Sequence, residues 1–299
     1  MNTSFIKGII PPIVTPITED ERIDEDRLRQ QLEFMIEGGI HGVLAFGTNG
    51  EFYAVDEPEA LRGLRILLDQ ANGRIPVFMG LGSISTRKCV ASAKAAAEAG
   101  ADAISVLQPM FIKPNEDELF THFKTVAESV PSVPVLLYNN PARIGYSISP
   151  ELAVRLGESV PNIVGIKDSS GDMTLTAEFI RRTRGSNFRV LGGKDTLCFG
   201  TLVHGGHGSV ATVANFAPKM MCAIYEKFVE GDLAGALDAQ YALNPVRLTI
   251  DKTTFPVGTK DILRLTGRDM GKPYLPVKLT QKEDVLNLMR EELRCADLL

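Results

Sequence analysis

Short apolar runs rich in β-branched residues recur along the chain, each bounded by glycine, proline or small polar residues. Runs of this kind are typical of buried parallel strands that are covered on both faces. They predict eight strands, at residues 9–15, 42–47, 76–82, 102–108, 134–139, 163–168, 188–193 and 206–212.

Between these runs, apolar residues recur at helical spacing and are flanked by helix start and stop signals. Asp24 precedes the first helical segment, and Gly38 and Gly39 end it. The other helical segments are residues 57–71, 86–99, 116–129, 150–157 and 172–184. This alternation predicts an α/β protein with a (β/α)8 TIM barrel, and a doubly wound open sheet is the alternative. We expect residues 1–230 to form the barrel and residues 231–299 to form a helical C-terminal extension.

Composition and charge narrow the class of protein. Of the 299 residues, 44% are hydrophobic and 23% are charged, as in soluble globular proteins. No segment approaches the run of about 18 apolar residues that a membrane helix needs. The net charge of -5 argues against nucleic acid as a partner. Pro11 and Pro12 interrupt the N-terminal apolar run before a signal peptide could form, so we expect a cytoplasmic protein.

Metal and nucleotide motifs are incomplete. The four cysteines form no CxxC pair, which suits reduced thiols better than a disulfide framework. His204 and His207 lie among glycines without further ligands, so we expect no metal site. The glycines near residues 80 and 193 complete neither a dinucleotide-binding motif nor a P-loop, so nucleotide binding is not supported.

Polar residues follow the predicted strands at their carboxyl ends, where the loops of a barrel form its active face. Lys167 comes near the end of the sixth strand, in the segment IVGIKDSSGD. Burial without a counter-charge would lower the pKa of this lysine and free its amine for attack on a carbonyl. The alternative is a lysine whose ammonium group reaches solvent or pairs with Asp168.

Three further strand-end residues have both a structural and a functional interpretation. Tyr138 could be a core side chain bonded to a carbonyl, or a general acid and base beside an imine. Thr48 could relay a proton, or belong to a simple turn between a strand and a helix. Arg143 could grip a carboxylate with its planar guanidinium, or lie on the surface.

Five motifs occur in the same order as in a known group of proteins. They are GIIPPIVTP at residues 8–16, GTNGE at 47–51, YNNPARIG at 138–145, GIKDSSGD at 165–172 and HGGHGSVATVANFAP at 204–218. Over essentially its whole length, the chain resembles the dihydrodipicolinate synthase / N-acetylneuraminate lyase superfamily.

The resemblance implies a barrel, usually a homotetramer, in which Lys167 forms a Schiff base with pyruvate. It also implies that Tyr138 transfers protons at the imine and the substrate hydroxyl. Thr48 and Asn49 would hold the pyruvate carboxylate, with the carbonyl of Val210 nearby. Because the iminium itself withdraws electrons, this chemistry needs no metal or organic cofactor.

Departures from the family pattern bear on the second substrate. Dihydrodipicolinate synthases normally carry a second tyrosine, lent to the neighbouring subunit, where this chain has Phe111. The threonine-tyrosine-tyrosine proton relay would therefore be broken at that link. Asn49 also replaces a usual threonine, which is closer to the keto-acid aldolases of the superfamily. Arg143, in contrast, stands where the synthases hold the carboxylate of aspartate semialdehyde.

The main interpretation is therefore a pyruvate-dependent class I lyase or aldolase that acts on a 2-keto-3-deoxy sugar acid or a 2-keto-4-hydroxy acid. Similarity to the sugar-acid enzymes would place the acceptor end of the substrate near Arg143, Ser169, Ser170, Lys194 and Asp195. One alternative is dihydrodipicolinate synthase, which condenses pyruvate with aspartate semialdehyde. Another is a non-catalytic homologue that only binds pyruvate.

Overall fold

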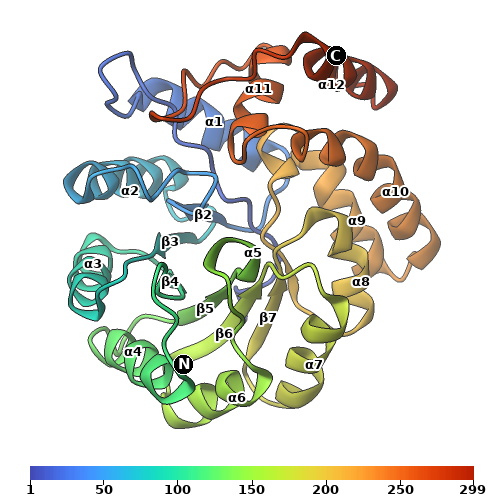
Figure 1. Cartoon of the computed structure of the whole chain (residues 1–299). Helices are drawn as coiled ribbons and strands as arrows, with labels where there is room; N and C mark the ends of the chain where they lie inside the picture. The colour runs from blue at the N-terminus through green and yellow to red at the C-terminus, as the bar shows by residue number, and fades with distance from the viewer.

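Eight parallel strands form the centre of the computed structural model, which describes residues 1–299 (Figure 1). They are β1 (Gly8–Ile9), β2 (Val43–Ala45), β3 (Val77–Leu81), β4 (Ala103–Leu107), β5 (Val135–Asn139), β6 (Ile163–Asp168), β7 (Arg189–Gly192) and β8 (Gly208–Ser209). The strands pair in the order β1-β8-β7-β6-β5-β4-β3-β2. A parallel bridge between Pro12 and Leu44 joins the chain after β1 to β2. The ring is thus closed, which confirms the (β/α)8 barrel over the open sheet.

Helices connect the strands, and all but the short α5, which lies over the centre of the ring, surround it (Figure 1). They are α1 (Glu25–Glu37), α2 (Glu57–Ala71), α3 (Thr86–Ala99), α4 (Glu116–Glu128), α5 (Pro141–Ile144), α6 (Pro150–Ser159), α7 (Met173–Thr183) and α8 (Cys198–Val203). The six helices predicted between the strands are present, with ends within two residues of the expected ones. Helices α5 and α8 were not predicted, because four and six residues are too few to show a helical period.

Strands β1 and β8 are two residues long, much shorter than the predicted runs 9–15 and 206–212. After β1, Pro11 and Pro12 have no backbone N–H to donate to a neighbouring strand. Around β8, glycines at 205, 206 and 208 favour other backbone conformations over a regular strand. These two runs therefore occupy barrel positions without forming long ladders.

An inner core fills the barrel and an outer core lies between the strands and the helices. The inner core consists of one residue from each of the eight strands or the residues directly after it, together with Ile6. Its members are Ile6, Ile10, Leu44, Phe78, Ala103, Leu136, Val164, Leu191 and Val210. The outer core is a single cluster of 64 buried residues. Apolar side chains fill the barrel interior. Polar groups therefore gather beyond this core, at the carboxyl ends of the strands.

A bulge in β6 directs Lys167 into the barrel. Val164 is an extra residue opposite the Val135–Leu136 step of β5. Since side chains alternate along a strand, one extra residue reverses the faces of those that follow. Val164 and Lys167 are an odd number of residues apart, yet one belongs to the inner core and the other lines the cavity above it. A Cβ at Gly165 would collide with the Arg189 carbonyl oxygen, so this close approach to β7 needs a glycine.

The C-terminal part of the chain consists of α9 (Pro218–Glu230), α10 (Leu233–Ile250), α11 (Val257–Leu265) and α12 (Glu283–Cys295). Helix α10 packs against α9 and α12, and α11 packs against the short 3-10 helix η2 (Val213–Asn215). In Figure 1, α11 and the chain after it lie beside α1. The division into a barrel and an extension at residue 230 stays a prediction.

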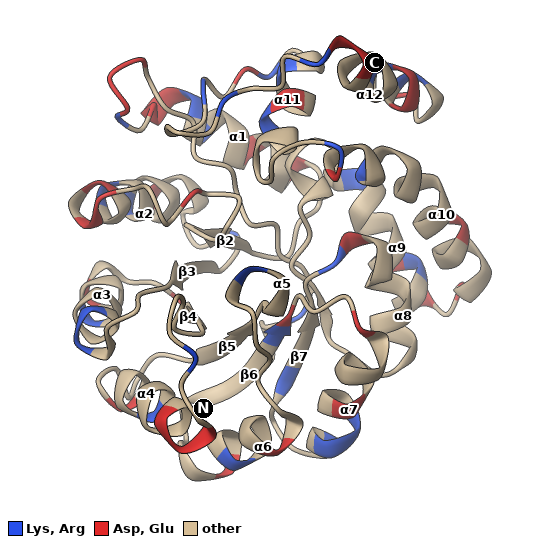
Figure 2. Cartoon of the chain, in the orientation of Figure 1, with Lys and Arg blue, Asp and Glu red and all other residues tan.

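Charged residues are spread mostly over the outer helices, with both signs intermixed (Figure 2). None of the helices combines the length and apolar character that a membrane crossing requires.

Candidate active site

A cavity of about 330 Å³ opens where the strands end, and it brings together nine of the ten residues that the sequence predicted for the site, all except Ser170, whose hydroxyl is bonded to Asp168. The nine residues are Thr48, Asn49, Tyr138, Arg143, Lys167, Ser169, Lys194, Asp195 and Val210. They come from the ends of β2, β5, β6, β7 and β8 and from the loops that follow. Sequence reasoning assigned no role to eight further lining residues, which are Pro12, Asn140, Ala142, Gly193, Thr212, Arg247, Asp251 and Phe255.

Lys167 and Tyr138 face each other across two neighbouring strands. They are directly paired in the register of β5 and β6. The Lys167 Nζ lies 3.9 Å from the centroid of the Tyr138 ring. Only 4% of Lys167 and 6% of Tyr138 is exposed, so both side chains are held inside the barrel. A cation over an aromatic face is stabilised by the ring, and this holds for an iminium as for an ammonium.

The ammonium group of Lys167 does not pair with Asp168. No carboxylate oxygen lies within 4.0 Å of its Nζ. Asp168 instead accepts hydrogen bonds from Asn139 Nδ2 at 2.8 Å, from Ser170 Oγ at 2.9 Å and from Thr176 Oγ1 at 2.5 Å. The structure therefore excludes both the surface lysine and the Lys167–Asp168 pair that the sequence left open.

Tyr138 has a polar environment around its hydroxyl. The Tyr138 hydroxyl lies 3.2 Å from Thr48 Oγ1 and accepts a hydrogen bond from Asn140 Nδ2 at 2.9 Å. Burial alone would raise the pKa of Tyr138, but the positive charge of Lys167 and these hydrogen bonds outweigh it and lower the pKa. A phenol that ionises more easily than usual is suited to move protons beside the lysine.

The loop after β2 presents backbone donors to the cavity. The backbone N–H groups of Thr48 and Asn49 donate to no other backbone group. Successive free N–H groups at the end of a strand can hold a carboxylate. The Asn49 side chain is fixed in place, since its Nδ2 donates to Thr212 Oγ1 at 2.8 Å and its Oδ1 accepts from Thr259 Oγ1 at 3.2 Å.

Ser169, Lys194 and Arg143 line the outer part of the cavity. The Ser169 hydroxyl lies 3.4 Å from the Gly193 carbonyl oxygen. A Cβ at Gly193 would collide with the Ser169 hydroxyl. Arg143 is exposed on α5, and its guanidinium lies 5.1 Å from the Phe255 ring centroid. Because Arg143 makes no ion pair, its charge is available to an anionic substrate.

The C-terminal segment contributes buried ionic groups to the site. Arg247 Nε donates to Asp195 Oδ2 at 2.8 Å, and Val213 N–H donates to Asp195 Oδ1 at 2.9 Å. Both side chains of this ion pair are more than 90% buried. Arg247 is the only basic residue in the otherwise largely apolar α10, and this is the one signal that could have identified it from the sequence.

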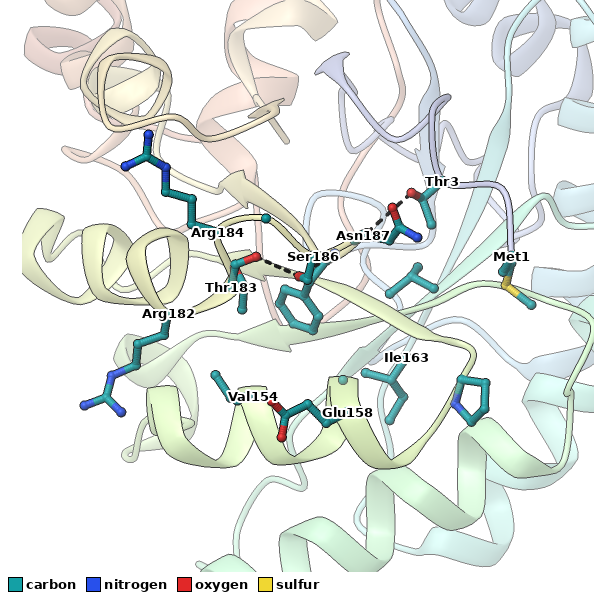
Figure 3. Close-up of a pocket in the computed structure, with 15 residues that line it drawn as sticks. Met1, Thr3, Val154, Glu158, Ile163, Arg182, Thr183, Arg184, Ser186 and Asn187 are labelled. Carbon is teal, nitrogen blue, oxygen red and sulfur yellow. Dashed lines mark hydrogen bonds between the residues drawn. The ribbon is translucent and has the colours of Figure 1, made fainter.

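Three larger cavities occur elsewhere, and none of them contains a residue that the sequence predicted for the site. One of about 460 Å³ lies where β6 and β7 begin, at the opposite end of the barrel (Figure 3). Arg182 and Arg184 point away from it in Figure 3. Ser186 Oγ is bonded to the Thr183 carbonyl oxygen. Residues at this end of a barrel usually serve stability, whereas chemistry is placed where the strands end.

Comparisons with known proteins agree with this geometry. The model of the dihydrodipicolinate synthetase family matches residues 5–292. A 4-hydroxy-tetrahydrodipicolinate synthase from Methanopyrus kandleri is 38% identical over 295 residues, which cover 98% of this chain and 97% of that protein. The enzyme of the same name from Methanothrix thermoacetophila is 35% identical over 294 residues, which cover 98% of each chain.

Solved structures superimpose over nearly the whole chain. Dihydrodipicolinate synthase from Thermotoga maritima gives a TM-score of 0.95 at 30% identity, covering 98% of this chain and 99% of its own. A prophage protein of the dihydrodipicolinic acid synthase family from Escherichia coli K12, solved in complex with pyruvate, gives a TM-score of 0.93 at 30% identity, covering 98% of this chain and 99% of its own. The chain belongs to the dihydrodipicolinate synthetase family and is an enzyme of this family, a pyruvate-dependent class I aldolase.

Proposed function

We propose that the protein condenses pyruvate with aspartate semialdehyde, as a 4-hydroxy-tetrahydrodipicolinate synthase. The names of its curated relatives favour this activity over the sugar-acid cleavage that was the main interpretation of the sequence. The observation that carries the proposal is the position of Arg143, an unpaired guanidinium in the same cavity as Lys167 and Tyr138. A guanidinium binds a carboxylate with two parallel hydrogen bonds, and aspartate semialdehyde carries one beside its amino group.

The first half of the reaction takes place on Lys167. Its amine attacks C2 of pyruvate, and loss of water gives the imine. The free N–H groups of Thr48 and Asn49 hold the pyruvate carboxylate, with the Val210 carbonyl nearby. Tyr138 transfers the protons, because its lowered pKa lets it both lose and regain one.

The second half forms the new carbon–carbon bond. A proton leaves the methyl group of the imine, and the resulting enamine attacks the aldehyde carbon of the acceptor, whose oxygen becomes a hydroxyl. The amino group of the acceptor then attacks C2, closes the ring and releases the amine of Lys167. Arg143 holds the acceptor carboxylate, and Ser169 and Lys194 lie at the same end of the cavity. The sequence also predicted that Asp195 lies at the acceptor end of the substrate, and this stays a prediction.

The experiment is to incubate the enzyme with pyruvate and aspartate semialdehyde and to follow the consumption of pyruvate and the cyclic product by mass spectrometry. Borohydride reduction with pyruvate alone tests the first half separately. An adduct at Lys167 together with product formation supports the synthase. An adduct without product excludes aspartate semialdehyde as the acceptor, and the absence of an adduct leaves the non-catalytic homologue.

One observation favours the keto-acid aldolase as a second candidate. Phe111 lies at the position of the second tyrosine and has no hydroxyl. It is 93% exposed and its φ is 74°, so the backbone presents the side chain outward in a conformation that costs free energy. An enzyme that does not use the outer tyrosine fits this residue. Pyruvate release from a panel of 2-keto-3-deoxy sugar acids and 4-hydroxy-2-oxoglutarate tests the candidate.

The Phe111→Tyr variant sharpens the choice between the two candidates. If the protein is a synthase with an incomplete proton relay, the added hydroxyl should raise kcat for the condensation about tenfold, in line with the contribution of one positioned proton-transfer group. Phe111→Leu serves as the control, because it changes the side chain without adding a hydroxyl. A rise in retro-aldol rate without any gain in condensation would favour the aldolase.

We also expect a homotetramer, as the family resemblance implies. Phe111 and its neighbour Ile112 are strongly exposed apolar residues on one loop, which suits burial against another copy of the chain. Analytical ultracentrifugation of the wild type and of Phe111→Asp would test this, since a charge in such an interface should shift the protein toward smaller species.

A further inference from the structure

We propose that Asp251 determines acceptor specificity by binding the ammonium group of a zwitterionic aldehyde. This inference rests on the proposed function, because it assigns the part of aspartate semialdehyde that Arg143 does not bind. Asp251 is the residue that ends α10, and it lines the same cavity as Arg143 and Lys167.

Only one of the two acidic residues of the cavity has a carboxylate oxygen without a partner in the protein. Both carboxylate oxygens of Asp195 already accept hydrogen bonds, from Val213 N–H and from Arg247 Nε. Asp251 accepts one, from Arg247 Nη1 at 2.9 Å, through its Oδ1. Its side chain is 57% exposed, and Oδ2 has no partner in the protein. Arg247 therefore fixes the Asp251 carboxylate while leaving one oxygen free.

The position of Asp251 at a helix end favours a cation there. The 18 residues of α10 run toward the cavity, so the helix directs its C-terminal, partly negative end at the site. The Asp251 carboxylate adds a full negative charge to that end. An ammonium group gains from both, whereas a second carboxylate would be repelled by both.

The remaining charges of the cavity complement a zwitterion. Its lining holds four basic side chains, those of Arg143, Lys167, Lys194 and Arg247, against the two acidic ones. The charge of Arg247 is offset by Asp195 and Asp251, both within hydrogen-bonding distance. Arg143 and Lys194 have no such partner, so the cavity presents unpaired cations and one free carboxylate oxygen to the same acceptor.

The test compares aspartate semialdehyde with succinate semialdehyde, which has the same carbon chain and carboxylate but lacks the amino group. Pyruvate is first reduced onto Lys167 with borohydride, so that no enamine forms and the aldehydes bind without reacting. Calorimetry should show aspartate semialdehyde binding to the wild type about three- to tenfold more tightly, as expected for a partly exposed charged hydrogen bond. Asp251→Asn should abolish this preference.

Steady-state kinetics give a second readout. Asp251→Asn should raise the KM for aspartate semialdehyde by the same factor and leave the KM for pyruvate unchanged. Asp238→Asn is the matched control, because Asp238 is an exposed aspartate on the same helix without an ion pair. It should behave as the wild type does.

Three results would overturn the inference. They are equal affinity of the wild type for the two aldehydes, a preference that survives in Asp251→Asn, and an equal loss of affinity for both aldehydes in that variant. Failure of the proposed function looks different, since it would appear as no pyruvate adduct or no condensation by the wild type, and the inference would then fall with it.

Discussion

Two regions of the chain build the same cavity in different ways. The loops after the barrel strands supply Lys167, Tyr138 and Thr48, which carry the groups that would react with substrate. The C-terminal segment supplies Arg247, Asp251 and Phe255 from outside the ring of strands. The first region places its residues by strand register, and the second places them by ion pairs and hydrogen bonds across the molecule.

The C-terminal segment also supports the loops from behind. Lys260 of α11 lies 2.7 Å from Glu51 in the loop after β2, and both side chains are at most 2% exposed. The neighbouring Thr259 donates its hydrogen bond to Asn49 of the same loop. The strand ends therefore provide the reactive groups, while the C-terminal segment holds their loops and shapes the outer part of the cavity.

The largest expected effect comes from removing the amine. Lys167→Ala should lower turnover by about a thousandfold or more, as for other enzymes that lose a covalent nucleophile. Mass spectrometry after borohydride reduction with pyruvate should show no adduct. Lys194→Ala is the control, since it removes another amine of the cavity and should keep the adduct. An adduct that persists in Lys167→Ala and disappears in Lys194→Ala would reverse the assignment.

The second prediction concerns the ion pair behind the loop after β2. Lys260→Met should destabilise the protein by about 3–5 kcal/mol, because it leaves the Glu51 carboxylate buried without a counter-charge. Urea unfolding followed by circular dichroism measures the change. Lys278→Met, an exposed position in the same segment, should change stability by less than about 0.5 kcal/mol.

A double variant separates the cost of the unpaired charge from the loss of packing. Glu51→Gln combined with Lys260→Met should recover much of the stability, because neither side chain is then charged. If Lys260→Met is as stable as Lys278→Met, the buried ion pair does not support the loop.

The sequence predicted the first region well, because strand-end residues follow from a local pattern. The apolar runs located all eight strands, and the segment around Lys167 and Tyr138 could be interpreted from its own residues and from the family resemblance. The bulge at Val164, which turns Lys167 inward, left no mark in the hydrophobic pattern except the glycine that follows it.

The second region could not be predicted, because its contacts join residues far apart in the chain. Arg247 and Asp195 are separated by 52 positions, and Thr259 and Asn49 by 210. From the sequence, a lysine or aspartate of a helical extension is indistinguishable from a surface charge, and surface positions are the usual ones for these residues. Only the folded chain shows that Lys260 and Arg247 are buried.

The smallest expected effects come from one threonine of each region, and together they test the division of roles. Thr48→Val removes a hydrogen bond that lowers the pKa of Tyr138, so ionisation of this tyrosine should move to higher pH and kcat should fall about tenfold. The only side-chain hydrogen bond that Thr259→Val removes is the one to Asn49, so this variant should leave that ionisation unchanged and raise the KM for pyruvate about two- to fivefold.

The ionisation can be followed by the absorbance of the phenolate. Burial raises the pKa of Tyr53, Tyr146 and Tyr274 to about 12, whereas that of Tyr138 is lowered, so its step should come first in a pH titration. Loss of this step in Tyr138→Phe identifies it. If Thr259→Val shifts the step as far as Thr48→Val does, the C-terminal segment acts on the chemistry itself, and the distinction between a reactive and a supporting region does not hold.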